Sequence, residues 1–164
     1  MQSRSVLLCF NSYFNYSITP QATQIAANNN CSNFLSALCP QGWVSSFHGK
    51  CFKVSSNRLN WTAAQLACEA LGSNLAVLNS IRKLREFPVS EPAVNVWIGL
   101  HRDAEYKSRW LWVGGSHINF TFWDTFEPNV NWRNQECAGM RMRSRRWYDL
   151  SCKENLLYIC EYGR

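Results

Sequence analysis

The residues with the clearest chemistry in this sequence are its cysteines, which number eight among 164 residues. Cysteines at that density form disulfides, bind zinc or carry out redox exchange. No pair has the Cys-x-x-Cys spacing, which argues against a zinc ribbon and against a thioredoxin-like redox site. Disulfides formed in an oxidising compartment are therefore favoured, although spacing alone leaves their pairing open. The cysteines are Cys9, Cys31, Cys39, Cys51, Cys68, Cys137, Cys152 and Cys160.

A second chemical feature is a cluster of five arginines within 14 residues on both sides of Cys137. Guanidinium groups pair bidentately with sulfate, carboxylate and phosphate, so sulfated or sialylated ligands are a candidate partner class. On a strand, alternate residues share one face, which would place Arg141, Arg143 and Arg145 together. A solvated surface is the alternative, because most short charge runs face water. The cluster consists of Arg133, Arg141, Arg143, Arg145 and Arg146.

Composition and motifs narrow the class of protein. Apolar residues make up 46% and charged residues 17%, which suits a packed core and excludes a disordered polar chain. The sequence lacks GxSxG, HExxH, P-loop and GxGxxG motifs, and its three histidines are scattered, so we predict no enzyme. No run approaches the roughly 18 consecutive apolar residues of a membrane span. The net charge of +6 favours acidic partners weakly, and the extracellular setting indicated by the cysteines disfavours nucleic acid.

Residues 1–38 differ in composition from the rest of the chain. They hold one charged residue, Arg4, and six asparagines, so we interpret them as a flexible leader or stalk. The apolar run at 6–10 is too short for a convincing signal peptide. Residues 39–164 carry all eleven acidic and 16 of the 17 basic residues and form the predicted globular domain. Cys31 in the stalk suggests a disulfide-linked dimer, with local pairing to Cys9 as the alternative.

Four Asn-x-Ser/Thr sequons point the same way as the cysteines. They begin at Asn15, Asn30, Asn60 and Asn119. Such sequons accept N-linked glycans in the secretory route. Together with the cysteine content they favour a secreted or extracellular glycoprotein.

The residues after position 38 predict a mixture of helices and strands. Asn60 is a suitable cap for a helix ending near Gly72, with Trp61, Ala64, Cys68 and Leu71 on one face. Residues 80–87 predict a second helix, which Pro88 ends. Aromatic and β-branched runs predict strands at 50–54, 96–100, 109–113 and 156–161, and two glycines predict a turn at 114–115. The segment 114–148 has an irregular pattern, which is typical of a functional loop.

The order of several motifs resembles the C-type lectin-like domain in its long form, over residues 39–162. The motifs are Cys39-Pro40-Gln41-Gly42-Trp43, Cys51-Phe52, Cys68 on a helix, Trp97-Ile98-Gly99-Leu100, Glu127-Pro128-Asn129, Cys137, Trp147-x-Asp149-x-x-Cys152 and Cys160-Glu161. The resemblance implies an α+β fold in which two helices flank small antiparallel sheets and a long irregular loop region binds ligands. It also implies the disulfides Cys39–Cys51, Cys68–Cys160 and Cys137–Cys152. Trp97, Trp110, Trp112 and Trp147 fit core positions of that fold.

The resemblance also implies a sugar site that depends on calcium. Glu127, Asn129 and Asp149 match the family's calcium ligands, and a cis peptide before Pro128 would point its neighbours at one ion. In the family this Glu-Pro-Asn loop goes with mannose-type hydroxyl pairs. Two positions depart from the pattern, since an uncharged Gln135 replaces an acidic ligand and a tyrosine replaces the asparagine that precedes Asp149. Calcium is therefore expected to bind weakly or not at all.

Two binding hypotheses follow for an extracellular module whose partners are glycans or glycoproteins. In the first, Glu127, Asn129, Gln135 and Asp149 bind sugar, while Trp132 stacks on the sugar's apolar face. In the second, the protein binds anionic glycans or a protein without calcium, through the arginine-rich face. A structural reading stays open as well, in which the Glu-Pro-Asn segment only shapes its loop.

Overall fold

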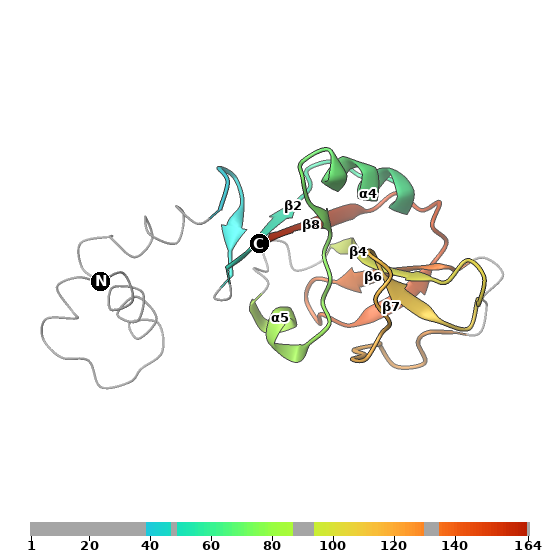
Figure 1. The fold of residues 1–164 in the computed structure, drawn as a ribbon. Helices are drawn as coiled ribbons and strands as arrows, with labels where there is room; N and C mark the ends of the chain where they lie inside the picture. The colour runs from blue at the N-terminus through green and yellow to red at the C-terminus, as the bar shows by residue number, and fades with distance from the viewer. Residues whose placement is uncertain (1–38, 47–48, 87–93, 130–134, 164) are drawn as a thin grey trace, which may run out of the picture.

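The computed structural model describes residues 39–46, 49–86, 94–129 and 135–163. Their helices are α4 (Trp61–Glu69) and α5 (Ile81–Glu86), which lie above and below β8 in the view of Figure 1. Their strands are β1 (Val44–Ser45), β2 (Lys50–Val54), β3 (Asn74–Leu75), β4 (Asn95–Arg102), β5 (Trp110–Trp112), β6 (Cys137–Arg141), β7 (Trp147–Leu150) and β8 (Leu157–Gly163). The predicted α+β class is therefore confirmed. The predicted stalk at 1–38, with Cys9 and Cys31, lies outside the described residues.

The strands pair in the order β1-β2-β8-β4-β6-β7, with β3 beside β8 and β5 beside β4. The antiparallel pairing of β2 with β8 sets Lys50 opposite Gly163, so a strand near the start of the domain lies beside its last strand. One pairing differs from the expected antiparallel pattern, because β4 and β8 run parallel at Val96 and Trp97. This contact joins the sheet at the domain ends to the sheet that carries the long loop.

Helix α4 begins where the sequence predicts, with the Asn60 Oδ1 accepting a 2.9 Å hydrogen bond from the Ala63 backbone N–H. Such a cap satisfies one of the free N–H groups of the first turn. The helix ends at Glu69 rather than near Gly72. Leu71 therefore lies beyond the helix and is 50% exposed, whereas Ala64 is buried as predicted.

The predicted strands are all present, but β6 and β7 fall in or across the segment predicted to be irregular. Ala138 and Gly139 of β6 have low strand propensity, so their sequence gives little signal. Tertiary packing against β7 accounts for the strand instead. The two strands lie so close that a Cβ added at Gly139 would be 2.9 Å from the Tyr148 hydroxyl on β7. Close approach of these two strands thus requires a glycine.

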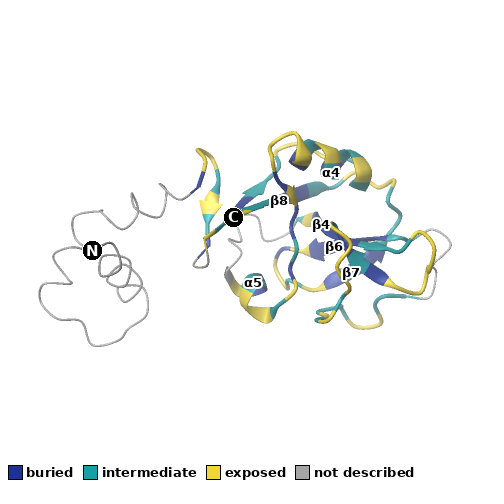
Figure 2. Ribbon diagram, in the orientation of Figure 1, coloured by how far each residue is buried: buried dark blue, intermediate teal, exposed yellow. Residues whose placement is uncertain are grey.

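Aromatic side chains fill the core between the sheet and the loop. Trp97, Trp112 and Trp147 are fully buried and Trp110 nearly so, which confirms the four predicted core tryptophans. The Trp112 and Trp147 rings meet edge to face with centroids 5.5 Å apart. Figure 2 shows the buried residues concentrated in β4, β6 and β7, the strands that support the long loop.

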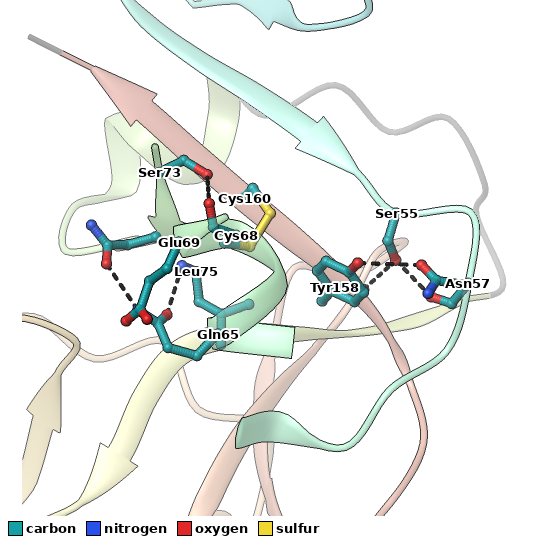
Figure 3. The surroundings of a disulfide bond; sticks show 10 residues. Ser55, Asn57, Gln65, Cys68, Glu69, Ser73, Leu75, Tyr158 and Cys160 are labelled. Atoms are coloured by element: carbon teal, nitrogen blue, oxygen red, sulfur yellow. Dashed lines mark hydrogen bonds between the residues drawn. A yellow bond between two sulfur atoms is a disulfide. The ribbon is translucent and has the colours of Figure 1, made fainter. Parts of the chain in front are cut away.

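The three disulfides implied by the resemblance are all present, and no cysteine in the described part of the chain is free. The Cys68–Cys160 bridge joins α4 to β8 across 92 residues of sequence. Figure 3 shows the bridge between Cys68 and Cys160, with the Ser73 hydroxyl donating a 2.7 Å hydrogen bond to the Cys68 carbonyl. This bridge ties the helix to the strand on which both sheets meet.

The length of the closed loop predicts the relative cost of losing each bridge. Chain entropy gives roughly 4–5 kcal/mol for the loop closed by Cys68–Cys160 and about 3 kcal/mol for the loop closed by Cys39–Cys51. We expect Cys68→Ala with Cys160→Ala to lower the free energy of unfolding more than Cys39→Ala with Cys51→Ala. Urea unfolding followed by tryptophan fluorescence measures both. A larger loss from the short loop would contradict this ranking.

Candidate functional site

The long loop between β5 and β6 is held against β7 by backbone hydrogen bonds. The Trp147 N–H donates to the Phe122 carbonyl at 2.9 Å, and the Asp124 N–H donates to the Trp147 carbonyl at 2.7 Å. The Glu127 N–H then donates to the Asp124 carbonyl at 3.0 Å, which closes a tight turn. These bonds bring the loop residues that follow Asp124 to the strand that carries Asp149.

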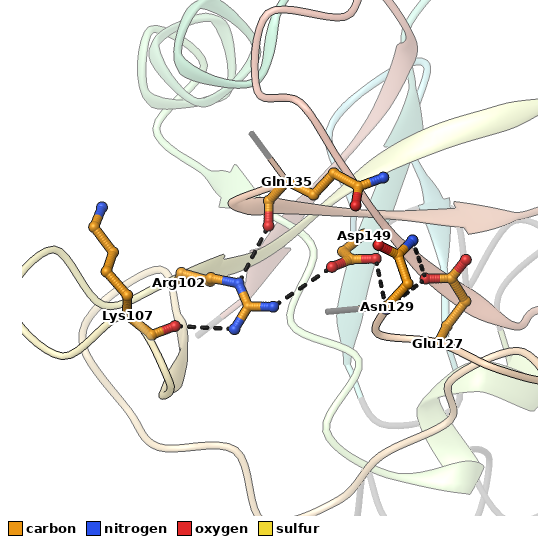
Figure 4. A network of polar contacts seen from close by, with 6 residues as sticks. All are labelled: Arg102, Lys107, Glu127, Asn129, Gln135 and Asp149. Carbon is orange, nitrogen blue, oxygen red and sulfur yellow. Dashed lines mark hydrogen bonds and ion pairs between the residues drawn. The ribbon is translucent and has the colours of Figure 1, made fainter. Parts of the chain in front are cut away.

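Three of the residues expected to bind sugar meet at this point. The Glu127–Pro128 peptide is cis, as the resemblance implies. The Asn129 backbone N–H lies 3.2 Å from Glu127 Oε2 and 3.1 Å from Asp149 Oδ1, and the Asn129 side-chain amide donates to Glu127 Oε2 at 3.3 Å. Figure 4 shows Asn129 beside both carboxylates. The loop and β7 thus form one polar cluster.

Asp149 is the most buried polar residue of this cluster, with 1% of its surface exposed. Burial, together with the hydrogen bond and negative charge of Glu127, raises the pKa of its carboxyl to about 6. The Asn129 N–H and the Arg102 charge act in the opposite direction.

Arg102, at the end of β4, is a part of the site that the sequence analysis did not identify. Its Nη2 lies 3.5 Å from Asp149 Oδ2, and its side chain is only 8% exposed. Its Nε donates to the Gln135 carbonyl at 3.2 Å, and its Nη1 donates to the Lys107 carbonyl at 2.9 Å. The guanidinium also lies 4.6 Å from the ring centroid of Trp110. A single arginine after a predicted strand has no sequence pattern that would mark it as part of a binding site.

Gln135 and Glu136 point to different surroundings, as expected for neighbours in extended chain. The Gln135 Oε1 is buried and has no hydrogen-bond partner among the residues described. Glu136 instead forms a 2.8 Å ion pair with Lys107 at the surface, with 39% of its side chain exposed. The residue near the cluster is therefore the uncharged Gln135 rather than the carboxylate of Glu136.

Tyr148, which replaces an asparagine of the family pattern, is not a candidate ligand in this arrangement. It is 6% exposed and packs across Gly139 of β6. Burial raises the pKa of its phenol above the ordinary value, so the hydroxyl stays protonated at neutral pH. The site thus lacks one carbonyl ligand that the family pattern provides.

The side chains present fit a calcium ion with a reduced donor set. Calcium takes 6–8 oxygen ligands from carboxylates, amide carbonyls and water. The crowded carboxylates of Glu127 and Asp149, with the unpartnered Gln135 Oε1, form such oxygen donors. No group of three or more His, Cys, Asp or Glu side chains that suits a metal occurs in the described residues. Because carboxylate number tunes calcium affinity, binding at this site is expected to be weak.

Arg141, Arg143 and Arg145 do not share the face of one strand, because β6 ends at Arg141 and a turn follows. Arg141 forms a 2.9 Å ion pair with Asp124, and Arg146 lies 4.2 Å from the Phe122 ring centroid. Arg143 is exposed, and Arg145 has a positive φ of 59° in the turn. Binding of anionic ligands by these arginines stays a prediction. Arg133 and Trp132 lie outside the described residues.

Phe126, directly before Glu127, is a second feature that the sequence analysis missed. It is 93% exposed, and its φ of 66° lies in the left-handed region that disfavours residues with a Cβ. Neither the exposure nor the backbone angle can be read from sequence. The chain thus keeps a strained aromatic residue at the edge of the polar cluster without packing it.

The fold and the loop define a lectin-like domain, and comparisons with known proteins agree. The sequence profile of the lectin C-type domain matches residues 57–162. The human protein "C-type lectin domain family 17, member A" is 34% identical over 124 residues, which cover 75% of this chain and 32% of the human protein. This chain therefore belongs to the C-type lectin domain family.

Two solved structures show how far the likeness in fold extends. The carbohydrate-recognition domain of the mouse scavenger receptor C-type lectin is 32% identical, with a TM-score of 0.68 over 77% of this chain and 97% of that one. The cow C-type carbohydrate-recognition domain of CD23, determined in the presence of GlcNAc2Man3 oligosaccharide, is 26% identical, with a TM-score of 0.69 over 77% of this chain and 96% of that one.

The comparisons also bear on the predicted absence of enzyme activity. The family and fold are those of non-enzymatic carbohydrate-binding domains, in agreement with that prediction. The chain spans about a third of the length of the human relative. Within the described residues, no helix has the length and apolar character needed to cross a membrane.

The backbone of Phe126 yields a stability prediction. Phe126→Gly relieves the left-handed strain and removes little packing, so we expect the free energy of unfolding to rise by roughly 0.5–1 kcal/mol. Thr125→Gly is the matched control, because Thr125 has no positive φ and glycine there only adds disorder to the unfolded chain. Urea unfolding measures both variants. Equal losses of stability would contradict the assignment of strain to Phe126.

Proposed function

We propose that this domain is an extracellular lectin that binds mannose-type glycans at the cluster of Glu127, Asn129 and Asp149, with Gln135 as a marginal ligand. The observation that carries the proposal is the joint hydrogen bonding of Asn129 to both carboxylates, which holds two loop residues and one strand residue together. Such convergence of carboxylate and amide groups suits recognition of sugar hydroxyls, which both donate and accept hydrogen bonds.

Calcium is the proposed cofactor of this site, held weakly. The oxygen atoms of Glu127, Asn129, Gln135 and Asp149 would hold it, and when bound it would supply coordination positions for two vicinal hydroxyls. The side chains around the ion then determine which sugar hydroxyls can bind at the site. Glu127 accepts hydrogen bonds from the sugar, and the side-chain amide of Asn129 donates them. The Glu-Pro-Asn order supports mannose-type ligands, because it goes with equatorial hydroxyl pairs in the family.

Phe126 is proposed to contact the bound glycan. Aromatic rings pack on the apolar faces of ligands, and this ring is exposed directly beside Glu127. The same Phe126→Gly variant that gains stability should therefore lose glycan affinity. This role resembles the one expected of Trp132, which lies outside the described residues.

A secretory route and glycan partners are consistent with the same proposal. The three disulfides need an oxidising compartment. Asn119 is exposed and available for N-glycosylation, whereas the Asn60 side chain caps α4. The cow domain determined in the presence of a mannose-containing oligosaccharide supports the proposed ligand class. Disulfide-linked dimerisation through Cys31 stays part of the proposal.

A glycan array with and without chelator tests the proposed function. We expect mannose-type glycans to bind in 10 mM calcium chloride, a concentration above the roughly 10⁻⁴–10⁻³ M dissociation constants of weak extracellular sites. Chelation should abolish the signal. Glu127→Gln should lose at least about tenfold in affinity, because it removes one of two carboxylates.

Glu136→Gln is the matched control, since it makes the same change one residue from Gln135 at a surface ion pair. It should bind as the unmodified protein does. Equal losses in the two variants, or glycan binding that ignores both chelator and Glu127→Gln, would contradict the proposed site.

A further inference from the structure

Both carboxylate oxygens of Asp149 already have partners in the protein itself. The Asn129 backbone N–H lies 3.1 Å from Oδ1, and the Arg102 guanidinium lies 3.5 Å from Oδ2. Figure 4 shows the two partners approaching Asp149 from opposite sides. A buried carboxylate satisfied in this way does not need a metal ion to keep its position.

Arg102 is fixed in that position by groups on three segments. The Gln135 carbonyl and the Lys107 carbonyl each accept one hydrogen bond from it, and the Trp110 ring lies against the guanidinium. These contacts come from the loop before β6, from the turn before β5 and from β5 itself. The guanidinium is therefore held by its own contacts and is nearly hidden from solvent, so its charge is poorly screened.

We propose that Arg102 is an internal counter-cation that holds Asp149 in place without metal and lowers the affinity of the site for calcium. The proposal rests on the proposed function, because the calcium concerned is the ion assigned to that site. A fixed positive charge beside a metal ligand repels the incoming ion and competes with it for Asp149 Oδ2. Arg102 thus raises the calcium concentration that is required to occupy the site.

Calcium titrations followed by thermal unfolding test this role. We expect Arg102→Gln to bind calcium at least about tenfold more tightly than the unmodified protein, because one buried positive charge is removed. A merely structural role would weaken calcium binding instead. Arg109→Gln is the matched control, since it makes the same substitution at an exposed arginine whose guanidinium lies over the Tyr106 ring, and its calcium affinity should stay unchanged.

A measurement on the unmodified protein covers the case in which Arg102→Gln does not fold. In ¹H–¹⁵N spectra, saturating calcium should shift or broaden the Arg102 Nε–Hε signal as the guanidinium gives up Asp149. Calcium binding that raises the melting temperature but leaves this signal unmoved would overturn the proposal.

The outcomes separate this inference from the proposed function. Equal calcium affinity in Arg102→Gln and the unmodified protein overturns the inference and leaves the lectin site standing. Calcium binding only in Arg102→Gln supports the inference and overturns the assignment of calcium as the cofactor of the unmodified site. No calcium binding in either protein overturns both the cofactor assignment and the role of Arg102.

Discussion

A buried carboxylate that must be stabilised is the constraint around which this site is built. Asp149 is almost completely removed from water, and a charged group there requires compensating partners. Arg102 supplies positive charge from one side, and Asn129 supplies a backbone hydrogen bond from the other. The cis peptide before Pro128 and the turn at Asp124 serve to bring Asn129 within reach. The conformation of the loop from Asp124 to Asn129 therefore serves to place a hydrogen-bond donor at Asp149.

The fold delivers these partners from regions far apart in the sequence. Arg102 ends β4 and Asp149 lies on β7, so the two residues are 47 positions apart and meet because β6 pairs with both strands. The Cys137–Cys152 bridge closes the base of this hairpin, and Trp147 packs beneath the loop. The Cys39–Cys51 bridge joins the start of the domain to β2, and the Cys68–Cys160 bridge joins α4 to β8.

The order of the motifs predicted the fold and the disulfide pairing only through its resemblance to the C-type lectin-like domain, because the spacing of the cysteines alone leaves their pairing open. Asn60 also predicted its helix start, since capping is a local property. The roles of Arg102 and Phe126 were not predictable. One depends on a tertiary ion pair and the other on the sign of a backbone angle. The shared face that a strand would have given Arg141, Arg143 and Arg145 does not form, because β6 ends at Arg141.

The interaction between Arg102 and Asp149 is tested most directly by a double-mutant cycle in chelator. The free energy of unfolding is measured for the unmodified protein, Arg102→Gln, Asp149→Asn and the double variant. The account predicts a favourable coupling of about 1–3 kcal/mol, because both side chains are buried and each leaves the other uncompensated. Additive effects, with coupling near zero, would mean that Asp149 is held by other groups and would contradict the account.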